Sequence, residues 1–453
     1  MPNSPKATWV PAKRVANDSP LWYLAAPFLL FLVSAGMGEW KTINNVLSGL
    51  PKAITLGIIA LAVAYAFISP DFKRLRFLAA PTALYLSFVA ALLCWSAIIW
   101  ILNFIGQASM IRGCSKMLFQ SISILSAVAA VYLFGEKAVD LFALGLCLVN
   151  GFIMLLEIPN FGLAESITSL VTCLVTFGDA VGYARNLEIH DLTFVFGQLV
   201  LYYAAFAPKN TRKERQTRRF LLFACLFFFL VGMKRIAIPA VVLFLVFALA
   251  FRRKKKMTVF LTVIGVLWIA FFFLYIYSIW TGALSEALGK LGVNMMGRDY
   301  LWRLAGDYYT FSPTFMGHGF EYVDTIVSDW YRSGLINHPY PFHNDILKVF
   351  VEVGFPGFLL WSGILYVAYP IFWAKYADGK TALLYMTLLS YMTVTYLTDN
   401  TAFYFWSTMS LRLVVLSYAF LRRKQKAAEE AAWRPESKEE IRQKIRLLMK
   451  EQL

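Results

Sequence analysis

The chain of 453 residues is 59% hydrophobic and only 15% charged, with 17% aromatic residues and a mean hydropathy of +0.59. Soluble proteins are roughly 45–50% apolar and about 25% charged, so the composition excludes a soluble enzyme. The formal net charge of +16 fits a multispanning protein whose basic loops face the cytoplasm. We therefore expect no nucleic-acid partner.

Apolar runs follow one another along most of the chain, each near the length of about 20 residues that one membrane crossing needs. They cover residues 21–37, 53–69, 78–103, 118–134, 138–157, 193–208, 220–233, 236–251, 257–280, 354–374, 381–398 and 401–421. The pattern predicts an all-α integral membrane protein with about 12 transmembrane helices. We expect the first run to be an uncleaved helix, because many further runs follow it.

Basic residues are concentrated in alternate connections between these runs. With a cytoplasmic N-terminus, the inside set comprises Lys73, Arg74 and Arg76, the segment 209–219, the segment 252–256, Lys375 and Lys380, and the tail from Arg422. This agrees with the positive-inside rule and predicts that both termini are cytoplasmic.

These runs and clusters divide the chain into five predicted parts. They are a cytoplasmic segment 1–19, transmembrane helices 1–9 within 20–280, a large and mostly helical outer loop 281–353, helices 10–12 within 354–421, and a basic cytoplasmic tail 422–453. The segment 158–192 and the turn at Lys234 and Arg235 also fall on the outer side.

Lys234 and Arg235 separate two apolar runs of 14 and 16 residues, 220–233 and 236–251. Both are shorter than the ~17–25 residues of a full crossing, so the turn is expected below the outer membrane surface. Each cation there costs roughly 2.5–3.5 kcal/mol on insertion scales unless something compensates. An anionic ligand would compensate; snorkelling of both side chains to the interface is the alternative.

The large loop holds three of the four histidines, namely His318, His338 and His343, together with arginines, aspartates and many aromatic residues. Aromatic and polar side chains together suit an amphipathic or sugar ligand, although an ordinary solvated loop has a similar composition. His343 is the candidate general base, because an imidazole can accept a proton at neutral pH. The spacing of His338, His343 and Asp345 matches no strong metal pattern, so we expect neither a metal nor another cofactor.

Two further arginines lie between or within apolar runs. Arg185 is the only basic residue of the segment 158–192. Arg412 falls near the middle of the last run, where a charge needs a partner or water. For Arg412, an ion pair with an acidic residue such as Asp399 and a contact with a ligand are equally plausible.

Three segments carry a resemblance to a known family: MKRIAIPAVVLFLVFALAFRRKK, MGRDYLWRLAGDYYTFSPTFMGHGF and PFHNDILKVFVEVGFPGFLLW. Across residues 232–363 they resemble the bacterial O-antigen ligase and O-antigen or capsule polymerase superfamily, with its H-N-x-x-L-x-x-x-x-E-x-G-x-x-G element. The resemblance implies a membrane-embedded glycosyltransferase of GT-C type that uses an undecaprenyl-diphosphate-linked glycan as donor.

The resemblance also assigns residues. The essential arginines of the family fall on Arg235 and Arg298, its histidine on His343, and a further arginine on Arg185. Lys234 replaces the usual small hydroxyl residue, and the stretch after Arg185 lacks the common Pro-Asn pair.

We expect the arginines to hold the diphosphate, since planar guanidinium groups pair bidentately with phosphate oxygens. His343 would deprotonate an acceptor hydroxyl in a single inverting displacement, with Asn344 or Asp345 orienting its imidazole. The predicted catalytic residues are therefore His343, Arg235 and Arg298. The predicted substrate-binding residues are Arg185, Lys234, Arg303, His338, Asn344 and Asp345.

A polymerase that extends lipid-linked repeats and a ligase that attaches the glycan to lipid A-core share this donor chemistry, and the GRDYLW and FHND segments favour the polymerase. Two alternative functions belong to other classes of protein. One is a polysaccharide flippase or other transporter, and the other is a non-catalytic membrane scaffold. The expected partners are the lipid-linked donor, a glycan or lipid-linked acceptor and the bilayer of the bacterial cytoplasmic membrane. A polysaccharide chain-length regulator is a further candidate.

Overall fold

The computed structural model describes residues 22–37, 50–103, 106–176, 182–187, 190–208, 211–232, 234–292, 295, 297–338, 341–397 and 399–432. In this part of the chain every regular element is a helix, which confirms the all-α prediction. Four of the described helices are long and apolar enough to cross a membrane: Phe72–Asn103, Ser109–Phe161, Met257–Trp280 and Asp345–Tyr376. The count of about 12 crossings and the GT-C architecture stay predictions.

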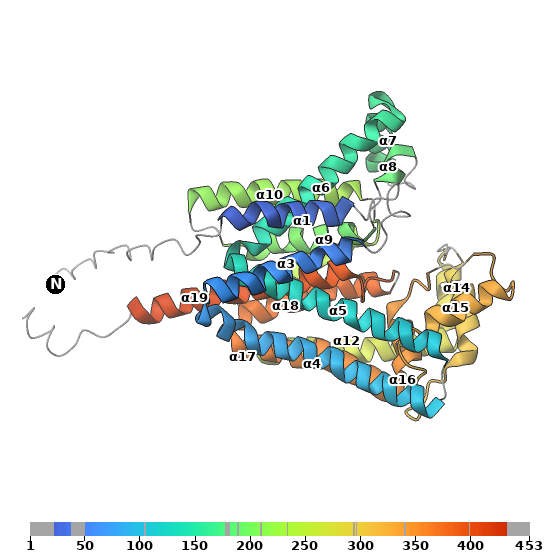
Figure 1. Cartoon of the computed structure of the whole chain (residues 1–453). Coiled ribbons are helices and arrows are strands. Elements are labelled where there is room, and N and C mark those ends of the chain that lie inside the picture. Colours follow the sequence, from blue (N-terminus) through green and yellow to red (C-terminus); the bar gives the residue numbers. More distant parts are fainter. Residues whose placement is uncertain are drawn as a thin grey trace, which may run out of the picture.

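The first helices run along the length of an elongated bundle (Figure 1). They are α1 (Trp22–Met37), α3 (Leu50–Ile68), α4 (Phe72–Asn103), α5 (Gln107–Phe134) and α6 (Ala138–Phe161). α1 packs against α3 and α6, and α5 packs against α3 and α4. Each of these helices overlaps one of the predicted apolar runs.

The segment expected to connect two crossings, 158–192, contains helices of its own. α7 (Leu163–Thr176) and the short α8 (Gly182–Asn186) contact each other and both contact α6. Figure 1 shows them projecting beyond the end of the bundle. Hydropathy does not predict α7, because polar residues interrupt its apolar positions and it forms no continuous apolar run.

The middle of the chain contributes helices that run alternately up and down the bundle. They are α9 (His190–Leu201), which continues as a π-helical turn at Tyr202–Phe206, then α10 (Arg212–Val231), α11 (Ala237–Phe251) and α12 (Met257–Trp280). A capping box starts α10: the Thr211 hydroxyl accepts from the Glu214 amide at 3.1 Å, and the Glu214 carboxylate accepts from the Thr211 amide at 3.2 Å. This box ends the basic connection and fixes where the helix begins.

The large loop between α12 and α16 folds into short helices. They are α13 (Ala283–Lys290), α14 (Arg298–Ala305) and α15 (Tyr322–Arg332). In Figure 1, α14 and α15 lie beyond one end of the bundle, and the C-terminal part of α19 projects from the other end. We call these the loop end and the tail end.

The last helices are α16 (Asp345–Gly363), a π-helical turn at Ile364–Ala368, α17 (Tyr369–Tyr376), α18 (Gly379–Tyr396) and α19 (Phe405–Ala432). α16 begins upstream of the apolar run that starts at residue 354, because Asn344 caps it and accepts from the Leu347 amide at 3.0 Å. Hydropathy does not mark this first part, since it contains the charged residues Lys348 and Glu352.

A buried ionic cluster explains how those charges are accommodated. The Lys348 ammonium, on a side chain only 5% exposed, lies 2.7 Å from Asp324 and 3.4 Å from Glu321, both near the start of α15. Lys116 of α5 pairs with the same two carboxylates. Burial alone would raise the pKa of Asp324, but Lys348 and Lys116 outweigh it and the pKa lies below its usual value. The cluster ties the large loop to α5 and α16.

Backbone contact between two glycines docks the loop a second time. Gly317 has a φ of +85° and Gly354, at the kink of α16, has a φ of +68°. A Cβ atom on Gly317 would lie 2.3 Å from the Gly354 nitrogen, so no other residue fits. The Phe355 amide donates to the Phe315 carbonyl at 2.8 Å across this contact. The loop is therefore held directly against α16.

Candidate active site

A cavity at the loop end brings two of the predicted catalytic residues together. Its volume is about 430 Å³, within the range of roughly 300–1,000 Å³ that small-molecule sites occupy. It is lined by Gly297, Arg298, Tyr300, Leu301, Leu335, Ile336, Asn337 and His343. The cavity lining therefore contains one guanidinium group and one imidazole group. The other side chains are mostly apolar, apart from the Tyr300 hydroxyl and the Asn337 amide.

Arg298 reaches the cavity because it is the first residue of α14. That helix buries Leu301, Trp302 and Ala305 against the bundle, which fixes its rotation about its own axis. Arg298 is half-buried on the cavity side. A half-buried guanidinium keeps its planar set of donors available to an anion.

His343 has an unusual backbone conformation for a non-glycine residue, with a φ of +52°. The left-handed region costs roughly 1–2 kcal/mol, so the surroundings must hold the residue there. On one side, the Trp302 indole donates to the Phe342 carbonyl at 3.4 Å. On the other side, Asn344 is fully buried as the cap of α16. His343 is thus clamped between α14 and α16, and its side chain remains 29% exposed.

Tyr275 of α12 joins this clamp to the end of α18. Its hydroxyl accepts a hydrogen bond from the Asn344 amide nitrogen at 3.0 Å and donates to the Leu397 carbonyl at 3.3 Å. Because Leu397 follows α18 directly, the hydroxyl connects the His343 segment to the connection between α18 and α19.

Asp399 lies in that connection and faces His343. Its Oδ1 is 3.4 Å from His343 Nδ1, and its Oδ2 is 3.8 Å from the Lys234 ammonium. Burial would raise the pKa of Asp399, but His343 and Lys234 lower it below the ordinary value. A carboxylate held ionised between an imidazole and an ammonium can orient the imidazole and stabilise its protonated form.

Comparison with protein families gives a match that covers most of this site. Residues 220–362, from α10 to α16, match the family model described as O-antigen ligase. The match supports an assignment of this segment to the O-antigen ligase and polymerase superfamily. A search of curated proteins gave no match.

The match supports a membrane glycosyltransferase of O-antigen ligase or polymerase type, a family whose substrates are lipid-linked glycans. Together with the apolar helices, it indicates the bacterial inner membrane. The matched segment contains Lys234, Arg298 and His343, whereas Asp399 lies beyond it. The resemblance noted in the sequence is thereby confirmed.

The other predicted basic residues occupy different places around the superfamily site. Lys234 lies beside Asp399, and Arg235 follows it in the exposed turn before α11. Arg185 is exposed on α8. Figure 1 shows α8 at the loop end but well separated from α14 and α15. The cavity lining includes none of these three residues, and their roles stay predictions.

The remaining predicted binding residues are either buried or turned to solvent. Asp345 is only 2% exposed, and its carboxylate accepts from the Ala402 amide at 2.7 Å. The Asn344 side chain also has partners already: its oxygen accepts from the Leu347 amide, and its nitrogen donates to the Tyr275 hydroxyl. Arg303, 70% exposed, pairs with Asp299 on α14, and His338 is exposed next to the cavity residue Asn337. Direct substrate contact by these four residues stays a prediction.

Arg412 is part of neither the site nor an ion pair with Asp399. Its guanidinium donates to Ser123 at 3.2 Å and to Gln120 at 3.4 Å, and it lies 5.6 Å from the centre of the Tyr85 ring. Within the described ranges no carboxylate oxygen lies within 4.0 Å of it. The structure thus gives this charge neutral partners.

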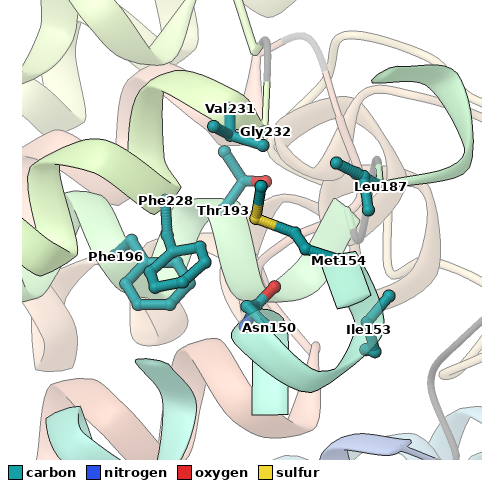
Figure 2. A pocket seen from close by; sticks show the side chains of 9 residues that line it. All are labelled: Asn150, Ile153, Met154, Leu187, Thr193, Phe196, Phe228, Val231 and Gly232. Carbon is teal, nitrogen blue, oxygen red and sulfur yellow. The ribbon is translucent and has the colours of Figure 1, made fainter. Parts of the chain in front are cut away.

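A second enclosed cavity lies near the turn that carries Lys234, between α6, α9 and α10. Figure 2 shows Asn150, Met154 and Thr193 around it, with the rings of Phe196 and Phe228 stacked at one side. Its volume is only about 10 Å³, which is about one water-sized sphere. This cavity is too small for a sugar or a diphosphate. Of the two cavities, the one lined by Arg298 and His343 is therefore the candidate active site.

Proposed function

We propose that this protein transfers an undecaprenyl-diphosphate-linked oligosaccharide to an acceptor sugar hydroxyl at the outer face of the bacterial cytoplasmic membrane, with inversion at the anomeric carbon. The observation that carries the proposal is the position of Arg298 and His343 in the lining of one cavity. The superfamily assignment supplies the class of donor.

The arginines act on the leaving group. As the bond between the anomeric carbon and the diphosphate oxygen breaks, negative charge grows on the departing undecaprenyl diphosphate. The Arg298 guanidinium stabilises that charge through bidentate hydrogen bonds, with Arg235 and Lys234 adding positive charge from the turn before α11. Charge stabilisation by guanidinium groups performs this step without a metal ion.

His343 acts on the acceptor. Asp399 Oδ1 lies 3.4 Å from Nδ1, and the negative charge there favours the tautomer that carries its proton on Nδ1, which leaves the lone pair of Nε2 to accept the hydroxyl proton. The acceptor oxygen then forms the new glycosidic bond while the diphosphate departs from the opposite face. Asp399 stabilises the imidazolium until the proton is released to solvent.

For the acceptor we propose a second lipid-linked repeat, which makes the reaction polymerisation of O-antigen or capsule units. Ligation to lipid A-core is the second candidate, favoured by the description of the matching family as O-antigen ligase. A deletion strain distinguishes the two. Single lipid-linked repeats accumulate when a polymerase is lost, whereas long lipid-linked polymer accumulates when a ligase is lost.

The decisive experiment uses the purified protein in detergent with a lipid-linked donor and an acceptor, without an energy source. Transfer under these conditions distinguishes an enzyme from a transporter or scaffold. His343→Ala is expected to lose turnover by about 10²–10⁴-fold while it still binds donor, and Arg298→Ala or Arg235→Ala to bind donor more weakly. Full transfer by His343→Ala would remove the base assignment.

A further inference from the structure

A basic cavity lies at the tail end of the bundle, opposite the candidate active site. Its volume is about 730 Å³, and its lining residues are Ala205, Phe206, Arg252, Arg253, Lys254, Lys255, Met257, Asp378, Gly379, Lys380, Leu383 and Tyr418. α12 and α18 both start at this cavity and end near the active site, at Trp280 and Tyr396. The two sites are therefore separated by the full length of these helices.

The charge around this cavity is strongly unbalanced. Five of its lining residues are cations, and Asp378 is the one acid among them. The Asp378 carboxylate is already engaged, because Oδ2 lies 2.6 Å from Arg422 Nε and Oδ1 accepts from the Thr381 amide at 2.8 Å. In the described part of the chain, none of the five cations lies within 4.0 Å of a carboxylate oxygen.

Two other basic residues of the predicted cytoplasmic connections do have carboxylate partners. Arg74 pairs with Asp71 at 3.1 Å, Arg218 with Asp140 at 3.9 Å, and the guanidinium of Arg74 also donates to the Tyr132 carbonyl at 2.9 Å. What distinguishes the five cations is that they line one cavity, where the only partner of their charged groups within the described part of the chain is the Phe260 ring, 5.4 Å from the Lys254 ammonium. A bound anion could therefore contact several of them at once.

The floor of the cavity is apolar and closely packed. Leu383 is fully buried, and Met257 and Tyr418 are 7% and 5% exposed. A Cβ atom on Gly379 would lie 2.9 Å from Met257 Cβ, so this glycine lets the α17–α18 turn approach the start of α12. The Phe206 ring packs edge-on against Tyr418, with centroids 6.1 Å apart. A ligand with a negatively charged group and an apolar part would suit this combination of cations at the rim and apolar residues below them.

We propose that this cavity binds the phosphate headgroup of an anionic phospholipid from the adjacent leaflet, with the first part of an acyl chain against the half-buried Phe206. Basic pockets between transmembrane helices bind such headgroups because a phosphate neutralises several cations at once. A soluble phosphate compound would satisfy the cations but would make no use of the partly exposed Ala205 and Phe206 beside them. The lipid would hold the α11–α12 and α17–α18 turns together.

The test compares the purified full chain in nanodiscs of phosphatidylcholine with and without phosphatidylglycerol. Retained lipid is counted by native mass spectrometry and thermal unfolding is measured in parallel. The triple variant Arg252→Gln, Arg253→Gln, Lys380→Gln removes three cavity cations. The matched control Lys213→Gln, Arg215→Gln, Arg219→Gln removes the same residue types from exposed positions on α10.

Each basic residue near an anionic surface strengthens binding by about fivefold. We expect the cavity variant to bind phosphatidylglycerol at least about tenfold more weakly, with its stabilisation by this lipid lost. The control should behave like the unmodified protein, and transfer in phosphatidylcholine alone should be the same for all three. Equal weakening in both triple variants would overturn the proposal, since diffuse charge would then explain binding.

Two more measurements complete the test. Inorganic phosphate is added to the unmodified protein in phosphatidylcholine. If phosphate stabilised the protein as much as phosphatidylglycerol does, the proposal of a lipid ligand would be overturned in favour of a soluble phosphate compound. Lys380→Glu is measured alone, because a single exposed reversal keeps the fold even if the triple variant does not. Undiminished phosphatidylglycerol retention by Lys380→Glu would also contradict the proposal.

Discussion

Asp399 and His343 lie 3.4 Å apart, carboxylate oxygen to imidazole Nδ1, although they belong to different connections of the helical bundle. We predict that Asp399→Asn lowers turnover by about 10- to 100-fold, part of the 10²–10⁴-fold that a general base contributes. The amide keeps the size of the side chain but cannot stabilise an imidazolium. Donor binding should change little, because the donor contacts belong to the arginines.

The measurement for Asp399→Asn is the transfer rate at saturating donor, compared with donor affinity from a direct binding assay. The lowered pKa of Asp399 keeps the carboxylate ionised at neutral and mildly acidic pH. Its protonation therefore sets neither limb of the pH–rate profile near neutrality. An Asp399→Asn protein with unchanged turnover would show that His343 needs no carboxylate partner.

Arg298→Lys should be nearly as damaging as loss of the charge. A lysine ammonium cannot reproduce the fork, and losing one charged hydrogen bond of about 1.5–3 kcal/mol predicts an increase of about 10- to 100-fold in donor Kd. Arg332→Lys is the matched control, since Arg332 is 71% exposed on α15 and pairs with Asp329 at 2.6 Å. Both variants are assayed for donor binding; equal loss at both positions would argue against a diphosphate contact at Arg298.

Tyr275→Phe tests the connection between the His343 segment and α18. Loss of the hydroxyl leaves the Asn344 amide without its 3.0 Å partner, and an unsatisfied buried donor costs about 1–3 kcal/mol. We expect a lower melting temperature together with several-fold slower transfer. Tyr277→Phe, on the same helix and 46% exposed, should stay within about 0.5 kcal/mol of the parent. A Tyr275→Phe protein that loses stability without losing rate would make Tyr275 purely structural.

The sequence predicted much of the fold because the bilayer demands long apolar helices. The run 257–280 coincides with α12 (Met257–Trp280). The start of α16 was not predictable in this way. Lys348 and Glu352 interrupt the apolar pattern, and only the folded loop supplies the carboxylates and the backbone amide that accompany them. Hydropathy describes contacts with lipid and does not describe contacts between the loop and the bundle.

The candidate site was predictable where its residues lie in the motif-bearing segments. Arg298 and His343 were found in this way, and the structure brings both to one cavity. Asp399 and Tyr275 were missed as site residues. Tyr275 is one of 23 tyrosines in the chain and lies within an apolar run, so no spacing marks it. For Asp399 a signal existed: Lys234 needed an anionic partner on the same side, and Asp399 follows an apolar run that ends there.

Gly317→Ala should undock the large loop from α16. The new Cβ atom would lie 2.3 Å from the Gly354 nitrogen and 2.5 Å from the Glu352 carbonyl oxygen, and both are backbone atoms that cannot rotate away. Overpacking of this kind costs typically 1–3 kcal/mol, in addition to roughly 1–2 kcal/mol for a left-handed alanine. We therefore expect a substantially lower melting temperature and faster proteolysis within the loop.

Gly334→Ala separates the two contributions, because Gly334 also has a positive φ of +77° but a Cβ atom there meets nothing within 4 Å. This control should show only the conformational cost. Transfer activity is measured on both variants, and Gly317→Ala should lose more of it because α14 and the His343 segment move with the loop. If the two substitutions reduced stability and transfer equally, the contact between Gly317 and Gly354 would not be what positions Arg298 opposite His343.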